Sequence, residues 1–348
     1  MNNFIKDIEI SNFKSIRHQK IEGCKRINVF IGYPNVGKSN ILEALSMLSY
    51  TQKADAKITQ LCRIQDFSEL YFDGNINEPV SIKISSQDTV SLKFESNYSL
   101  LFEQSVKLKN DSAGRIRTLK KLRFPIDSTP ISNIEDTSIA EMLIKTSDLK
   151  QVVVKKYQYK SSIEKDVSGY PSLFFPDGQN LFYTVERNPQ LRKDVVDLLS
   201  FYGLKLLFDK GNKYSMKAMK TLNDETVFSI PFFQIADTLQ RLIFYKAAIQ
   251  TNTDSVLIFE EPEAHMFPPY ISKFTSEIWD NDSNQYFLAT HSPFVLNDFM
   301  ENAKEDLAIY VVDYKNGETI VKRLSDEDVH QAYQFGMDLF FNLESYLG

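Results

Sequence analysis

The sequence has few of the residues that stabilise secreted and membrane proteins. It contains two cysteines, Cys24 and Cys62, among 348 residues. Their spacing offers neither a metal-ligand pattern nor a disulfide framework, which suits a reducing compartment. No apolar run approaches the roughly 20 residues that span a bilayer, and the N-terminus lacks the apolar core of a signal peptide. These absences predict a cytoplasmic protein that makes no membrane contact.

Positive charge is also in deficit. Lysine and arginine number 40 against 46 aspartates and glutamates, for a formal net charge of −6. This balance argues against a surface that coats nucleic acid on every side, but it leaves room for a local basic patch. Two basic groups fit a nucleic-acid or partner surface, and both also fit the solvated face that charge runs more commonly form. The first lies within Lys107–Arg123 and comprises Lys107, Lys109, Arg115, Arg117, Lys120, Lys121 and Arg123; the second comprises Lys150, Lys155, Lys156 and Lys160.

The clearest chemical signal is an eight-residue stretch, G-x-x-x-x-G-K-S, at residues 32–39. An apolar strand is expected before it at Ile27–Ile31, and a helix is expected after it from Ser39 to about Tyr50. Strand, loop and helix in this order are the context that a phosphate-binding loop requires. Its glycines let the backbone fold around an anion, and the helix N-terminus directs positive partial charge at phosphates. The predicted nucleotide-binding residues are Gly32, Tyr33, Pro34, Asn35, Val36, Gly37, Lys38, Ser39 and Asn40.

Two side chains of this loop have specific predicted tasks. Lys38 would reach the β- and γ-phosphates, and the Ser39 hydroxyl would ligate Mg²⁺. The alternative is a Gly-Pro-Asn turn that happens to precede a helix, and the complete motif with both flanking elements disfavours it. The sequence therefore predicts a site for a nucleotide with Mg²⁺.

Two apolar runs in the last third of the chain predict buried strands of a parallel sheet. Val256–Phe259 ends in Glu260-Glu261, and Gln285–Ala289 ends in Thr290-His291. Ligands of such sheets bind at the carboxyl ends of the strands. A solvated strand end is the alternative for the acidic pair alone, but its occurrence together with the phosphate loop favours a site.

This placement predicts a task for each polar side chain. Glu260 would hold Mg²⁺, directly or through a water molecule, beside Ser39. Glu261 would accept the proton of the attacking water, because hydrolysis of a phosphoanhydride needs an oriented nucleophile. His291 would contact the γ-phosphate.

The chain is longer than one core usually supports, which predicts a head domain with an insertion. The predicted head covers residues 1–60 and 225–348, and the predicted insertion, an α+β subdomain, covers 61–224. Within the insertion, residues 80–84 and 90–94 alternate as antiparallel strands do. Asn188-Pro189 begins a predicted helix that Gly203 stops. Before the phosphate loop, a strand is expected at residues 4–10 and a turn at 11–15.

Four motifs in order resemble those of an ABC-type AAA-family ATPase, and in particular the RecF-like and overcoming-lysogenization-defect (OLD) group. They are Asn12-Phe13-Lys14-Ser15, the phosphate loop followed by Glu43-Ala44, Ile258–His265 and Thr290–Pro293. The resemblance covers about residues 1–60 and 225–348. It implies an α/β fold: a P-loop NTPase with an ABC-type ATPase head, a mixed sheet flanked by helices, and a large β-rich plus helical insertion between Walker A and Walker B. It also implies a head-to-tail dimer around two ATP molecules.

In that family, a signature segment before the Walker B strand contacts the γ-phosphate of the partner chain. The matching segment here is Ile235–Arg241, with Ala236 where a serine is usual and Thr238 where a glycine is usual. Asp237, Thr238 and Arg241 are therefore the expected contacts to the partner's nucleotide. Because of these departures, ATP hydrolysis is expected to be slow or to depend on a partner.

OLD nucleases carry a TOPRIM domain after the ATPase, and no acidic metal-binding cluster of that kind follows His291 here. The resemblance therefore implies an ATPase that forms a nucleotide-dependent dimer or scaffold and regulates a separate effector, as in bacterial anti-phage defence. A RecF-like DNA-binding ATPase in DNA repair or recombination is the alternative. A transporter subunit is disfavoured by the altered signature and by the size of the insertion.

Overall fold

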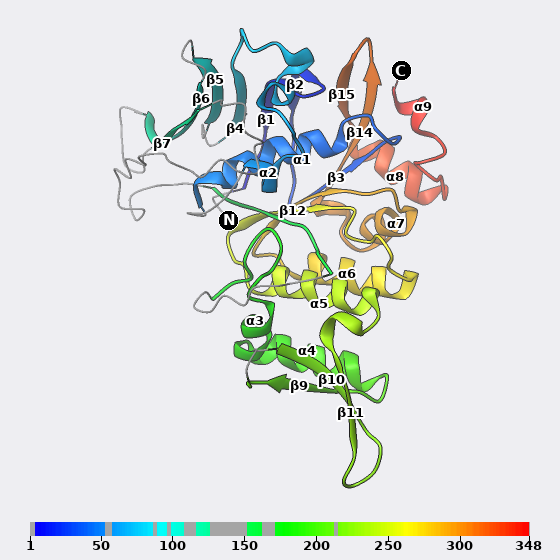
Figure 1. Ribbon diagram of the computed structural model, residues 1–348. Helices are drawn as coiled ribbons and strands as arrows, with labels where there is room; N and C mark the ends of the chain where they lie inside the picture. The colour runs from blue at the N-terminus through cyan, green and yellow to red at the C-terminus, as the bar shows by residue number, and fades with distance from the viewer. Residues whose placement is uncertain are drawn as a thin grey trace.

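The computed structural model describes residues 4–52, 58–85, 89–95, 99–107, 116–125, 152–161, 171–211 and 215–347. At its centre lies a six-stranded sheet in the order β15-β14-β3-β13-β12-β8 (Figure 1). Its five strands from β14 to β8 are parallel, and β15 is antiparallel to β14. The strands are β3 (Ile27–Ile31), β8 (Val153–Tyr157), β12 (Ser255–Glu260), β13 (Gln285–Ala289), β14 (Leu307–Lys315) and β15 (Glu318–Arg323).

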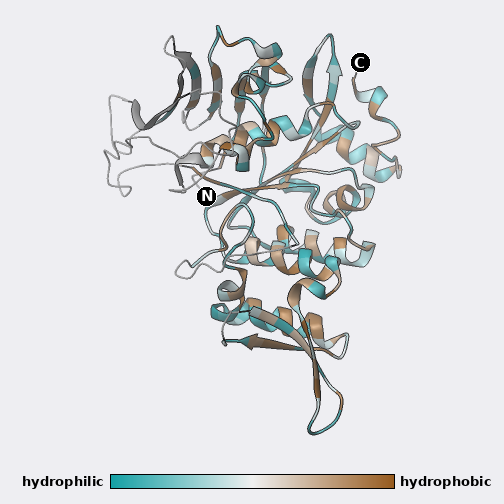
Figure 2. Ribbon diagram, viewed as in Figure 1, coloured by the Kyte–Doolittle hydropathy of each residue, from teal (hydrophilic) through white to brown (hydrophobic). Residues whose placement is uncertain are grey.

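The central strands are apolar throughout because both faces of the sheet are covered. In β12, Leu257 and Phe259 belong to one hydrophobic core, whereas Val256 and Ile258 belong to the core on the opposite face. Figure 2 shows these strands as predominantly hydrophobic. The predicted parallel sheet is therefore confirmed. The expected strands at residues 27–31 and 285–289 match β3 and β13, and β12 is one residue longer at each end than expected.

Helix α1 (Lys38–Ser46) and a second sheet cover one face of the central sheet, and helices α5 (Asp237–Gln250), α6 (Pro268–Asp280) and α7 (Pro293–Asn302) cover the other (Figure 1). The helix expected to reach Tyr50 is regular only to Ser46 and continues as a 3₁₀ helix over Met47–Gln52. The remaining α-helices are α2 (Ile58–Leu61), α3 (Leu181–Arg187), α4 (Pro189–Ser200), α8 (Asp326–Gln334) and α9 (Leu343–Leu347).

The second sheet has the order β2-β1-β4-β5-β6-β7 and is antiparallel. Its β4–β5 pair confirms the two strands expected near residues 80–94. Since this sheet also contains β1 and since β8 joins the central sheet, strands of the predicted insertion belong to both sheets of the predicted head. The strands are β1 (Ile8–Phe13), β2 (Ile16–Ile21), β4 (Val80–Ile84), β5 (Thr89–Glu95), β6 (Ser99–Lys107) and β7 (Ile116–Pro125).

The expected strand at residues 4–10 and turn at 11–15 are displaced in the structure. Strand β1 continues to Phe13, which is fully buried, and the turn is confined to Lys14 and Ser15. The hairpin then returns as β2, which the sequence pattern did not predict. The buried alternation of Ile8 and Ile10 continues at Asn12, and Phe13 is buried out of phase with it. Phe13 pairs with Ile16 and with Tyr71, so its burial and pairing outweigh the turn tendency of the neighbouring serine and asparagine.

Below the central helices in Figure 1, α3 and α4 pack with a small sheet in the order β11-β10-β9. Its strands are β9 (Lys205–Asp209), β10 (Ser215–Thr221) and β11 (Val227–Pro231). The expected helix start at Asn188 is confirmed, because its side chain accepts a hydrogen bond from the Leu191 N–H at 3.1 Å. Within the described residues, no helix is both long and apolar enough to cross a membrane.

Candidate functional site

The predicted phosphate loop lies between β3 and α1, and its two motif glycines have no room for a side chain. A Cβ at Gly32 would overlap the Val312 carbonyl oxygen, and a Cβ at Gly37 would overlap the Thr319 hydroxyl. Gly37 also has a φ of +105°, a conformation that favours glycine. Asn35 adopts a positive φ of +63° in the same loop. The path of the loop backbone therefore depends on glycine at both positions.

The Lys38 ammonium lies over this loop. It donates hydrogen bonds to the Gly32 and Tyr33 carbonyl oxygens at 2.9 and 2.7 Å. Burial lowers the pKa of Lys38 to about 8, and the negative charge of Glu261 opposes that shift. Like the negative charge of Glu261, a phosphate bound in the loop would stabilise the charged form of Lys38 and raise its pKa.

Glu260, at the end of β12, lies beside the start of α1. Its Oε2 is 3.2 Å from Lys156 Nζ, and its Oε1 accepts a hydrogen bond from Arg63 Nη2 at 2.9 Å. Burial alone would raise the pKa of Glu260, but the Lys156 charge, the hydrogen bond from the Ser39 hydroxyl and the Arg63 charge hold it below its ordinary value. A hydroxyl and an ionised carboxylate side by side are oxygen donors that suit Mg²⁺, so Ser39 and Glu260 fit the metal of a nucleotide complex.

Lys156 and Arg63 were not predicted as parts of this site. Strand β8 pairs in parallel with β12 so that Lys156 lies opposite Ile258, about 100 residues away in sequence. Arg63 follows α2, and its Nε also donates to Glu43 Oε1 at 2.9 Å. The fully buried Glu43 carboxylate forms a second ion pair with Lys14. The available sequence signal was the position of Lys156 two residues after Val154, a spacing that places both side chains on one face of a strand.

Glu261 and His291 come together from the ends of two neighbouring parallel strands, with 3.5 Å between Glu261 Oε1 and His291 Nε2. Both are open to the surface, since 53% of the Glu261 side chain and 37% of the His291 side chain are exposed. Burial and then the Lys38 charge lower the pKa of His291, so its imidazole is neutral at pH 7. Glu261 has a φ of +44° and donates its backbone N–H to the Ala289 carbonyl at 2.9 Å.

Glu263 fixes the segment that carries His291, although the sequence predicted no role for it. Its Oε1 accepts hydrogen bonds from the Thr290 hydroxyl at 2.5 Å and from the His291 N–H at 3.2 Å. Burial raises the pKa of this carboxyl group. Through these two hydrogen bonds, the buried Glu263 side chain fixes the backbone position of His291.

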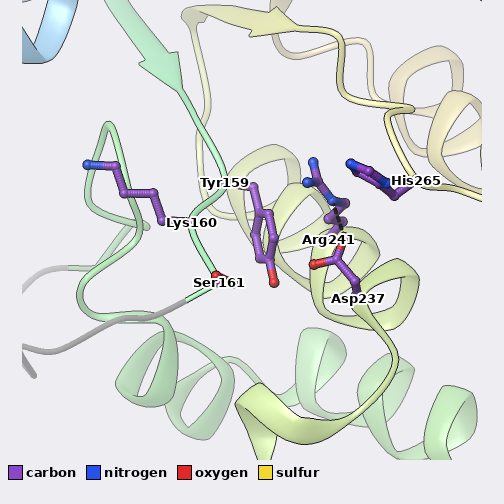
Figure 3. A pocket seen from close by; sticks show the side chains of 6 residues that line it. All are labelled: Tyr159, Lys160, Ser161, Asp237, Arg241 and His265. Atoms are coloured by element: carbon purple, nitrogen blue, oxygen red, sulfur yellow. Dashed lines mark hydrogen bonds and ion pairs between the residues drawn. The ribbon is translucent and has the colours of Figure 1, made fainter.

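The signature-like residues lie at the N-terminal end of α5, in a different place. Arg241 is paired with Asp237 at 2.6 Å and lies 4.7 Å from the centre of the Tyr159 ring. The Thr238 hydroxyl donates to the His265 carbonyl at 2.8 Å. Asp237, Arg241 and Tyr159 lie around a cavity (Figure 3). The volume of this cavity is about 670 Å³. Its lining contains no residue of the phosphate loop and consists of Tyr159, Lys160, Ser161, Asp237, Arg241 and His265.

The two predicted basic groups have different surroundings. In the second group, Lys156 pairs with Glu260 and Lys155 donates to Asn252 Oδ1 at 2.5 Å, so these two lysines point inward and do not form a solvated or nucleic-acid face. In the first group, Lys107 ends β6, and Arg117, Lys120, Lys121 and Arg123 lie on the edge strand β7. Lys109, Arg115 and Lys150 lie outside the described residues.

A model of the family described as "AAA domain, putative AbiEii toxin, Type IV TA system" matches residues 27–297. The chain belongs to this AAA-domain family. The match includes the phosphate loop, both strand ends that carry Glu260 and His291, and the start of α5.

Relatives of this AAA-domain chain cover shorter stretches. RecF of Thermoanaerobacter sp., a DNA replication and repair protein, is 39% identical over 70 residues, which are 20% of this chain and 18% of RecF. An uncharacterised protein of Methanocaldococcus jannaschii is 29% identical over 119 residues, which are 31% of this chain and 54% of that protein. The chain therefore spans less than two thirds of the length of either relative.

The fold of this AAA-domain chain is similar to that of an SMC head solved in complex with the C-winged helix domain of ScpA. The TM-score is 0.52 at 14% identity, and the likeness covers 93% of this chain and 99% of that one. The α/β fold class is therefore confirmed: this chain has a P-loop fold of ABC type, with a mixed sheet flanked by helices.

The pKa of Lys38 predicts how ADP affinity depends on pH. The lysine is charged below about 8 and loses its proton as the pH rises through that value. Because phosphate binding favours the charged form, the dissociation constant of metal-free ADP should rise by up to about tenfold per pH unit above this point. Titration calorimetry at a series of pH values from neutral to alkaline measures this dissociation constant. The uncharged variant Lys38→Met should bind ADP weakly at every pH, and an equal pH dependence in that variant would contradict the assignment.

Proposed function

We propose that this chain binds ATP with Mg²⁺, hydrolyses it slowly, and forms a nucleotide-dependent dimer or scaffold that regulates a separate effector protein. Its setting would be bacterial anti-phage defence in the cytoplasm, and its closest kinship within the family would be with the OLD-like group. The observation that supports the proposal is that Asp237 and Arg241 line a cavity that contains no residue of the phosphate loop.

The first surface, formed by the phosphate loop and the ends of β12 and β13, carries the groups that we propose act on the nucleotide. Lys38 would neutralise the β- and γ-phosphates, and Ser39 with Glu260 would hold Mg²⁺, which supplies charge neutralisation for the leaving group. Glu261 would accept a proton from the attacking water, since its carboxylate is exposed and lies next to His291. The neutral imidazole of His291 would donate a hydrogen bond to the γ-phosphate or orient that water.

The second surface, at the N-terminal end of α5, carries the positive charge of Arg241. Arg241 is oriented by Asp237 and Tyr159 at the N-terminal end of α5, where backbone N–H groups favour anions. In a head-to-tail dimer, this surface of one copy would face the γ-phosphate bound by the other. Such an arrangement would make hydrolysis depend on assembly, which is what a regulator of an effector requires.

The wider role is supported by the family and not by the site geometry alone. The family description names an AbiEii toxin and a Type IV toxin–antitoxin system. In such a setting, ATP-dependent assembly would present a surface to the effector.

Mixing two inactive variants tests the shared site. Lys38→Ala should abolish nucleotide binding in its own loop, and Arg241→Ala should disable only the α5 surface. A mixed dimer then holds one intact composite site, so a one-to-one mixture should recover about a quarter of the wild-type ATPase rate if chains exchange freely.

The control mixture combines Lys38→Ala with Glu261→Gln. Both substitutions disable the nucleotide surface of the chain that carries them, so no mixed dimer contains an intact site and the rate should stay at the level of the separate variants. Recovery in the control, or none in the test mixture once chain exchange is demonstrated, would contradict the proposal.

The RecF similarity supports a second candidate, an ATPase that binds DNA in repair or recombination. Basic residues on the edge strand β7 would be the contact surface. This candidate predicts that duplex DNA stimulates ATP hydrolysis and that the triple variant Lys120→Gln, Lys121→Gln, Arg123→Gln loses the stimulation while keeping the basal rate. A basal rate that is indifferent to DNA in the wild-type protein would dismiss it.

A further inference from the structure

Thr319 lies far from the phosphate loop in sequence but touches it in the fold. It is a fully buried residue of β15, the strand that forms the edge of the central sheet. Its hydroxyl donates a hydrogen bond to the Val36 carbonyl oxygen at 2.8 Å, across 283 positions of the chain. Its backbone N–H donates to the Ser15 carbonyl at 2.7 Å. Thr319 therefore joins the phosphate loop to the β1–β2 turn.

The hydrogen bonds around Thr319 run in one direction. A carbonyl only accepts, so the single hydroxyl proton of Thr319 goes to Val36. The Thr319 oxygen, 2.7 Å from the Ser15 hydroxyl, then accepts the proton of Ser15. The Ser15 oxygen in turn accepts a hydrogen bond from Asn40 Nδ2 at 2.7 Å. Hydrogen bonds linked in series polarise one another, which strengthens each of them.

The last hydrogen bond of this series, from Thr319 to Val36, fixes a backbone donor of the phosphate loop. The carbonyl of Val36 and the N–H of Gly37 belong to the same trans peptide plane and point in opposite directions. Holding the carbonyl on Thr319 directs the Gly37 N–H away from β15. This N–H is one of the successive donors that such a loop offers to phosphate oxygens.

The packing of Gly37 leads to the same residue. A Cβ at position 37 would overlap the Thr319 hydroxyl and come within 2.9 Å of the Ser15 hydroxyl. The loop therefore rests directly on this pair, and glycine is required there in part because Thr319 is present. Loss of the hydroxyl would leave the Val36 carbonyl without this buried donor and the peptide plane free to turn.

We propose that Thr319 is a positioning residue for nucleotide binding: through its hydroxyl, the C-terminal hairpin β14–β15 holds the Val36–Gly37 peptide in the orientation that receives a phosphate. This inference rests on the proposed function only in requiring a nucleotide in the loop. It also assigns a role to Ser15 and Asn40, which complete the chain of donors.

The test measures ADP affinity by titration calorimetry in three variants. Thr319→Val keeps the shape and removes the hydroxyl, and it should weaken ADP binding roughly tenfold, the equivalent of one well-formed hydrogen bond. Thr319→Ser keeps the hydroxyl and should stay within about twofold of wild type. The matched control is Thr184→Val, which removes a buried hydroxyl bonded to the Asn180 carbonyl at 2.9 Å in α3 and should leave ADP affinity unchanged.

Wild-type affinity in a folded Thr319→Val protein, or an equal loss in Thr184→Val, would overturn the inference. If Thr319→Val does not fold by circular dichroism, Ser15→Ala decides, because it breaks the donor chain at an accessible turn and should weaken ADP binding a few-fold; unchanged affinity in that variant overturns the inference as well. Wild-type protein that binds ADP but never hydrolyses ATP would remove the proposed enzyme activity and leave the Thr319 test intact. Wild-type protein that does not bind ADP would overturn both.

Discussion

The site depends on one half-buried carboxylate, that of Glu260, and on the two cations that offset the cost of its partial burial. Glu260 lies at the edge of the central sheet against Lys156, Arg63 and the Ser39 hydroxyl. An ionised carboxylate so placed is strongly unfavourable without such partners. Because they come from β8, the segment after α2 and the start of α1, their pairing holds three distant parts of the chain in register. Removing one of these partners would leave less compensation for the partial desolvation of the Glu260 carboxylate.

Backbone strain gathers around this edge of the sheet. Glu261 and His265 both have positive φ angles, at +44° and +61°, in the short connection between β12 and α6. Asn35 in the phosphate loop has a φ of +63°. Residues other than glycine adopt this conformation at a cost of about 1 kcal/mol or more, and they cluster where a site must be held ready. Hydrogen bonds such as that from Glu261 N–H to Ala289 stabilise the strained connection.

Local sequence patterns predicted those parts of the fold that depend on local physics. Strands β3 and β13 were predicted to the residue, because a fully apolar run of five residues is explained by burial on both faces. The phosphate loop and the start of α4 were also predictable, since glycine, lysine, asparagine and proline act within a few residues of themselves. The relative placement of Glu261 and His291 followed from the rule that parallel strands end at one edge.

The contacts that no local pattern encodes were missed. Lys156 read as part of a basic surface, although β8 pairs with β12 and turns it toward Glu260. Thr319 gave no signal at all, since a threonine in an alternating strand is ordinary until the fold brings it to Val36. Strand β1 was predicted to end too early and β2 was missed, because Phe13 at the end of β1 pairs with Tyr71, which lies far away in sequence. These failures share one cause, which is pairing over long sequence separations.

If the phosphate-loop surface of one chain and the α5 surface of another form one site, as we propose, ATP hydrolysis requires two chains. The most direct measurement is the specific rate of ATP hydrolysis at increasing protein concentration, with the mass of the particles determined in the same samples. A site shared between chains predicts that the rate per chain rises in step with the fraction of dimer. A rate per chain that stays constant while monomers become dimers would show that one chain holds a complete site, and would contradict a site shared between chains.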